Sequence, residues 1–314
     1  MFKMKEGVAK VLIPFAVLII VAINSNVTEY LTGKDYPAPL MLVFYGVFSL
    51  VLNCIAGLFT RQAIFPKQWK FQIVRLVNNG ISMLLIFISF KYLSAGSVSL
   101  IQRTDIPFVI MLSFFLGEKK SNLQFWLSLW SILTVIFMIV DARLINEESG
   151  GFGYAFAGVI MISAGYIIIR KSVAVETVYS LSNVNSIGMI LVGTITMFVQ
   201  HYSWYINPGH LWIFCLGGLM LFAIYVVAIP LYVWYQPERA RFPYILGALG
   251  TAIIEMIVER KMYPVSQIAL ILLISGMIMT ISLNANAPEF SYSVLKKIKK
   301  RVRKRSVIKI SQRA

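Results

Sequence analysis

The sequence has few charged side chains and few of the residues on which common catalytic and metal motifs depend. Only 13% of its 314 residues are charged, compared with about 25% in soluble domains. It contains 2 histidines and 2 cysteines, and Cys54 and Cys215 both lie in apolar runs, which predicts no disulfide framework. HExxH, CxxC, G-x-S-x-G and GxxxxGK[ST] are absent, which argues against zinc proteases, common hydrolases and ATP-driven pumps. We therefore expect no enzyme activity, no metal site and no cofactor.

Long hydrophobic runs dominate the composition instead. Hydrophobic residues make up 58% of the sequence, and the mean hydropathy is +0.77. Ten apolar segments have the length of about 17 to 25 residues that a helix needs to cross a bilayer. They span residues 8–27, 38–59, 70–91, 95–116, 123–140, 152–169, 179–200, 211–235, 240–258 and 264–284. The sequence therefore predicts an all-α integral membrane protein with ten transmembrane helices.

Basic residues in the loops predict the orientation of these helices. With the N-terminus in the cytoplasm, 22 of the 29 Lys and Arg lie on the cytoplasmic side and 5 on the outer side. Cytoplasmic loops normally carry this excess of positive charge. We therefore predict a multi-pass protein of a plasma or inner membrane with both termini in the cytoplasm.

A polar loop at 141–151 is the best candidate for a boundary between two halves. We predict a first five-helix repeat at 1–141, a second at 142–285 and a cytoplasmic tail at 286–314. Because five is an odd number, the two repeats would be inverted in the membrane. Two helix ends resemble each other weakly, GEKK at 117–120 and VERK at 258–261. Inverted repeats allow alternating access, in which one half rocks against the other.

The span 95–116 carries two ionisable residues, Arg103 and Asp105, and a proline at Pro107. A proline cannot donate a backbone hydrogen bond, so Pro107 frees the carbonyl group of Arg103. Ionisable side chains are costly in lipid and must face a polar cavity or a partner. Broken helices of this kind are typical of transporter binding sites.

The depth and spacing of these residues indicate separate roles. Asp105 lies about 15 Å into its helix, near the bilayer midplane, and shares a helix face with Gln102. We interpret it as a proton or cation site or as a contact to a substrate amine; the alternative is a buried structural ion pair. Arg103 points to another face and suits a carboxylate or phosphate, unless its side chain reaches outward to the headgroups.

Three polar residues of the third span, Arg75, Asn78 and Asn79, are also candidates for substrate binding. Polar groups at this depth require partners on facing helices. We expect Asn78 or Asn79 to contact Asp105, and interhelical hydrogen bonding is an equally good interpretation of both asparagines.

Further candidates lie in the second half. Tyr225 and Tyr232 flank a second helix-breaking proline, Pro230, and share one stripe of their helix. They form a candidate aromatic wall for a cationic or heterocyclic substrate, with packing as the alternative. Glu255 is a second candidate for proton coupling besides Asp105, although it lies near the outer membrane face.

The basic run KKIKKRVRKR at 296–305 lies beside the membrane. Basic clusters in this position bind anionic lipid headgroups. We expect membrane lipids as its partner and no nucleic acid.

Several of these features resemble EamA-like permeases of the drug/metabolite transporter superfamily. The segment FKYLSAG at 90–96, Pro107 in the short span and LGE at 116–118 stand where the family carries similar motifs, and Arg75 matches an arginine early in the third helix. The resemblance implies a ten-helix fold with a central cavity lined by both halves, and export or exchange of small metabolites.

Together these features predict a secondary transporter of small polar metabolites, zwitterionic compounds such as amino acids or nucleoside-like compounds, with protons as a possible coupling ion. Two other classes remain open. An intramembrane enzyme acting on a lipid-linked substrate would require clustered carboxylates, whereas those of this sequence are isolated. The other alternative is a transport-inactive membrane scaffold.

Overall fold

The computed structural model describes residues 6–116, 126–133 and 148–234 and single positions between 240 and 276. These residues form helices and turns, and no strand occurs among them. Seven of the described helical segments are long and apolar enough to cross a membrane. The protein therefore has the all-helical architecture that a multi-pass membrane protein requires.

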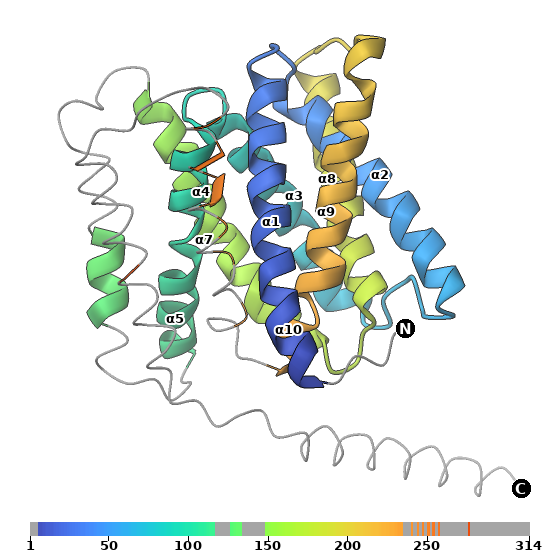
Figure 1. Ribbon diagram of the computed structural model, residues 1–314, viewed down its shortest axis with the longest axis vertical. Helices are drawn as coiled ribbons and strands as arrows, with labels where there is room; N and C mark the ends of the chain where they lie inside the picture. The colour runs from blue at the N-terminus through green and yellow to red at the C-terminus, as the bar shows by residue number, and fades with distance from the viewer. Residues whose placement is uncertain are drawn as a thin grey trace, which may run out of the picture.

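The helices follow one another with short connections (Figure 1). They are α1 (Glu6–Thr32), α2 (Ala38–Phe59), α3 (Trp69–Ser89), α4 (Ala95–Gln102), α5 (Asp105–Phe115), α7 (Glu148–Ser172), α8 (Val178–Val199), α9 (Leu211–Ala228) and α10 (Leu231–Trp234), with a 3-10 turn at Pro208–His210 before α9.

The expected spans agree in position with most of these helices. The span 38–59 has the bounds of α2, while 95–116 is divided into α4 and α5. The span 211–235 is divided at Pro230, which follows the end of α9. The spans 240–258 and 264–284 lie largely outside the described residues, as does 123–140 apart from a helical stretch at 126–133.

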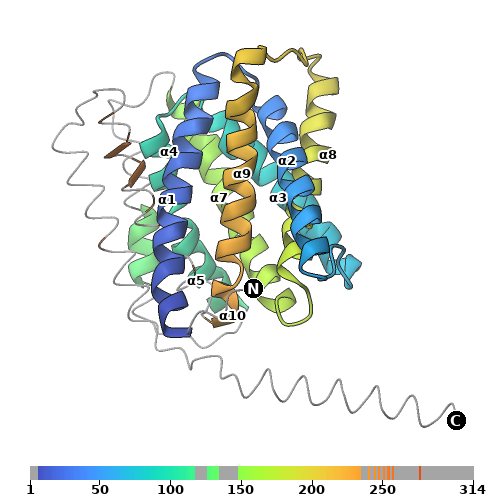
Figure 2. The same ribbon diagram turned by 45° about the vertical axis from the view of Figure 1, so that its right-hand side comes forward.

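Helix α8 packs mainly on two helices, α2 and α3. It contacts α2 on one side and α3 on another, while α7 packs on α3 and α9 packs on α1 and α2. Figures 1 and 2 show α1 beside α9 and α2 beside α8 from two directions. Two apolar clusters join these helices, one centred on α2, α3 and α4 and one between α1, α7 and α10.

Glycines permit the close approach of α2 and α8. A Cβ atom added at Gly46 would lie 2.9 Å from the Ile190 side chain, and one added at Gly193 would lie 2.8 Å from the Val43 side chain. Gly193 and Ile190 follow Gly46 and Val43 by the same number of positions. The contact therefore maps onto itself when the two helices are exchanged.

The same exchange relates the neighbouring helix pairs. If α1, α2 and α3 correspond to α7, α8 and α9, the contacts of α3 with α7 and α8 correspond to those of α9 with α1 and α2. All four contacts occur in the structure. Helices α1–α3 and α7–α9 thus pack in a reciprocal arrangement around the α2–α8 pair.

Candidate functional site

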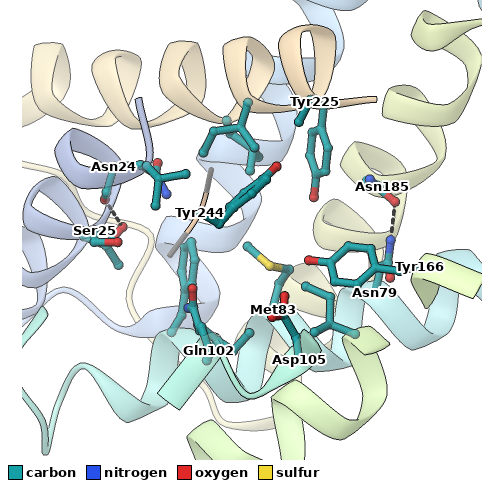
Figure 3. Close-up of a pocket in the computed structure, with 18 of the residues that line it drawn as sticks. Asn24, Ser25, Asn79, Met83, Gln102, Asp105, Tyr166, Asn185, Tyr225 and Tyr244 are labelled. Atoms are coloured by element: carbon teal, nitrogen blue, oxygen red, sulfur yellow. Dashed lines mark hydrogen bonds between the residues drawn. The ribbon is translucent and has the colours of Figure 1, made fainter. Parts of the chain in front are cut away.

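A cavity lined by both polar and apolar side chains lies between α1, α3, the α4–α5 junction, α7, α8 and α9 (Figure 3). About 90 Å³ of it is open to the centres of water molecules. The cavity therefore has room for several waters or for part of a small metabolite. Its wall combines amide, tyrosine and aliphatic side chains with Arg103 and Asp105.

The break between α4 and α5 places polar residues at the wall of the cavity. Helix α4 ends at Gln102 and α5 begins at Asp105. The residue after Ile106 is Pro107, which has no backbone N–H. The carbonyl of Arg103 therefore accepts from the N–H of Ile106, at 3.3 Å. This tighter turn interrupts the helix beside the side chains that line the cavity.

Arg103 is held inside the protein and is only 1% exposed. Its Nε donates to the Ser99 carbonyl at 3.0 Å, and its Nη2 donates to Oε1 of Gln102 at 3.0 Å. The guanidinium carbon also lies 5.3 Å from the centre of the Tyr244 ring, within the range of a cation–π interaction. Arg103 thus faces the interior and does not extend toward the headgroups.

Asp105 opens α5 and is also only 1% exposed. Its side chain lines the cavity together with Gln102, although the two residues lie in different helices, α5 and α4. Its backbone carbonyl accepts a hydrogen bond from Ser163 Oγ of α7 at 3.3 Å. The described lining residues thus contain one carboxylate and one guanidinium, and their charges balance.

Arg75 is fully buried but does not line the cavity. Its Nη1 donates to Oε1 of Gln72 at 3.1 Å. Its Nη2 donates to the Leu181 carbonyl at 3.0 Å and to Oδ1 of Asn185 at 2.8 Å. Arg75, which we expected to contact the substrate, thus lies behind the cavity wall and bonds α8.

The two asparagines of α3 face different helices. Asn78 donates to the Met161 carbonyl of α7 at 2.7 Å, and it does not line the cavity. Asn79 lines the cavity and donates to Oδ1 of Asn185 in α8 (Figure 3). Among the described residues their hydrogen bonds go to α7 and α8, which corrects the expectation that one of them bonds Asp105.

Tyrosines form the aromatic part of the wall. Tyr225 and Tyr232 both line the cavity, one in α9 and one in α10. The rings of Tyr166 and Tyr232 stack with centroids 6.0 Å apart. The turn containing Pro230 separates the two helices, and Tyr232 N donates to the Ile229 carbonyl at 3.0 Å. Glu255 lies outside the described residues.

Four polar lining residues did not emerge from the sequence analysis: Asn24, Ser25, Thr28 and Asn185. The first three come from α1, where Ser25 Oγ accepts from Ser99 Oγ at 3.0 Å. They belong to two polar stretches of membrane-length helices, NSNVT at 24–28 and SNVNS at 182–186, and this clustering is the signal that could have identified them. Apolar length alone defined those spans, so the polar positions within them went unused.

Within the part of the chain that the structure describes, no three His, Cys, Asp or Glu side chains lie close enough to hold a metal ion. The basic run 296–305 is outside the described residues.

No protein-family model and no curated protein matches the sequence. Twenty-eight chains of solved structures match the fold. One of them, described only as a crystal structure of a protein, has a TM-score of 0.64 at 12% sequence identity, and the match covers 88% of this chain and 98% of that chain. The likeness shows a shared fold and gives no information about a substrate.

Proposed function

We propose that this protein is a secondary transporter of small polar metabolites that works by alternating access. The observation that carries the proposal is a cavity beside a broken helix, with Arg103 and Asp105 both buried in its wall. Buried ionisable groups in membrane-length helices typically mark substrate or ion pathways. The balanced charge of the described wall favours substrates without net charge, such as amino acid zwitterions or nucleoside-like compounds.

The proposal includes ten transmembrane helices in two inverted five-helix repeats. It is supported by the reciprocal packing of α1–α3 and α7–α9 around the α2–α8 pair. The α2–α8 contact stays the same when the two helices are interchanged. Two equivalent units related in this way would share one central site. Discontinuous helices near that site are a recurring feature of such transporters.

We further propose membership of the EamA-like permeases. Support comes from the sequence motifs around FKYLSAG and Pro107 and from the cavity that the resemblance implies. Both termini are proposed to lie in the cytoplasm of a plasma or inner membrane, with the basic tail on anionic lipids. A reporter fused after Ala314 should be active only in the cytoplasm, and activity on the outer side would contradict the ten-helix topology.

Counterflow in proteoliposomes tests the transport function directly. Liposomes preloaded with an unlabelled amino acid or nucleoside should accumulate the same labelled compound. Arg103→Ala should reduce accumulation, because it removes a charged group from the cavity wall. Binding without counterflow would favour a membrane scaffold, and chemical conversion of a lipid-linked compound would favour an enzyme.

A further inference from the structure

Arg75 does not line the cavity, but it determines which side-chain atoms one wall of the cavity presents to a ligand. Arginine has five N–H donors and no acceptor. Its Nη2 lies 2.8 Å from the Asn185 side chain, so the atom of Asn185 at that position must be the carbonyl oxygen. The usual ambiguity between the oxygen and nitrogen of an asparagine side chain is therefore resolved by chemistry.

The same reasoning extends to the next side chain. Asn79 approaches the oxygen of Asn185 that already accepts from Arg75. An oxygen atom can receive only donors, so Asn79 must present its amide nitrogen there. Arg75 thus fixes two amide groups in sequence, although it lies outside the cavity.

This chain of bonds fixes a hydrogen-bond donor at the cavity. Asn185 is 1% exposed and lines the cavity, with its amide nitrogen on the side away from Asn79 (Figure 3). That nitrogen has no hydrogen-bond partner among the described residues. A buried donor without a partner is unfavourable, so a ligand that accepts from it would gain affinity.

A matching acceptor lies on α1. Asn24 lines the same cavity, and its Oδ1 has no hydrogen-bond partner among the described residues. Figure 3 shows Asn24 and Asn185 on opposite sides of the cavity. A molecule between them would accept a hydrogen bond at one end and donate one at the other.

We propose that Asn185 binds an uncharged oxygen of the substrate, a carbonyl or a hydroxyl, and that Arg75 is the positioning residue that holds this donor in place. The inference rests on the proposed transport function and narrows the substrate to a neutral molecule with both acceptor and donor groups. The one carboxylate and one guanidinium of the described wall give no net attraction for either ion sign.

The first test measures thermal shifts of the purified full-length protein with named probes. Inosine, uridine, nicotinamide and myo-inositol represent the neutral class, and glutamate, uridine monophosphate and spermidine represent charged compounds. At least one neutral probe should raise the melting temperature while the charged probes do not. The proposal is overturned if no neutral probe binds, or if only charged probes do.

Variants then test the two residues with the neutral probe that binds best. Asn185→Asp keeps an oxygen for Arg75 but replaces the cavity donor with an acceptor, and it should weaken binding about tenfold. Arg75→Gln leaves Asn185 intact but no longer fixes the orientation of the Asn185 amide. This variant should also reduce the preference for a probe that carries an acceptor group over an analogue that lacks the group. Inosine and nebularine, which lacks the carbonyl group, form such a pair; Arg75→Lys should restore part of the preference.

Asn53→Ala is the matched control, because Asn53 is a fully buried amide that bonds α8 at Ser182 but does not line the cavity. It should lower stability without changing the probe preference. If Asn185→Asp and Arg75→Gln also leave the preference unchanged, their role is merely structural and the proposal fails.

Counterflow with the same probes separates this inference from the transport function. Binding of a neutral probe without counterflow would contradict transport but support the Asn185 subsite. Counterflow of glutamate alone would support transport and overturn the subsite.

Discussion

Polar side chains inside the long apolar helices form two groups, one packed between helices and one lining the cavity. Between α2 and α8, Asn53 Nδ2 donates to Ser182 Oγ at 2.8 Å, and Ser186 Oγ donates to Ser49 Oγ at 3.1 Å. None of these four residues lines the cavity. We call these four residues the α2–α8 cluster.

The amides of the cavity wall are arranged differently. Asn24 Oδ1, Asn79 Oδ1 and Asn185 Nδ2 are buried, and within the described residues no hydrogen-bond partner reaches them. Asn53 Oδ1 of the α2–α8 cluster also has no hydrogen-bond partner among the described residues, so the two groups differ in position: Asn24, Asn79 and Asn185 line the cavity, whereas Asn53 does not. The comparison shows that polarity within a span does not separate structural hydrogen bonds from a binding site; the place of each residue relative to the cavity does.

The largest effect on transport should follow from changing Asp105, which lines the cavity. As a hypothesis, Asp105→Asn removes a titratable group at similar shape, so it should reduce proton-driven uptake more than about tenfold while equilibrium exchange continues. Exchange and pH-driven uptake are measured side by side in liposomes. Loss of both would instead indicate contact with a substrate amine, and unchanged driven uptake would exclude both roles.

A second change should affect stability rather than transport. A Cβ atom at Gly188 of α8 would lie 2.2 Å from the backbone oxygen of Leu76. Gly188→Ala should therefore push α3 and α8 apart and cost about 1–3 kcal/mol of stability, measured as a lower melting temperature. Gly150→Ala is the control, because no described atom lies within 4 Å of that Cβ position. Equal melting temperatures for the two variants would contradict this packing.

A smaller loss of stability should come from the α2–α8 cluster itself. Asn53→Ala removes the donor to Ser182, and hydrogen bonds between membrane helices contribute about 0.6 kcal/mol on average and up to about 1.7. Denaturation in detergent should show a loss of that size, with the transport rate per folded molecule unchanged. A loss of transport in the folded variant would break the distinction between the two groups.

The smallest effect should come from the tyrosine wall. Tyr225→Phe keeps the ring at the cavity and removes only the hydroxyl group, so KM should rise about threefold at most. Tyr205→Phe serves as the control, because Tyr205 is 71% exposed and does not line the cavity. An effect of Tyr225→Phe larger than that of Asp105→Asn would reverse the proposed order of importance.

Local sequence information was enough for several features of the site. The apolar length of the spans predicted helices, and the identical bounds of α2 reflect the continuous apolar run at 38–59. Gln102 and Asp105 also line the cavity together, although the helix breaks between them, where α4 ends and α5 begins. The α8 partners of Arg75, Leu181 and Asn185, were not accessible in this way, since they lie more than 100 positions away.

By itself, the sequence determined the all-helical class, because apolar spans in a bilayer must satisfy their backbone hydrogen bonds internally. It also determined that Arg103 and Asp105 are costly to bury, because both stand in an apolar span. Only the tertiary structure decided that Arg75 lies behind the wall while Asn185 lies in it. Whether a side chain on one helix lines a cavity or is covered depends on the helix that faces it. The approach of α3 and α8 at Gly80 and Gly188 sets that relation, and no single span specifies such a contact between two distant spans.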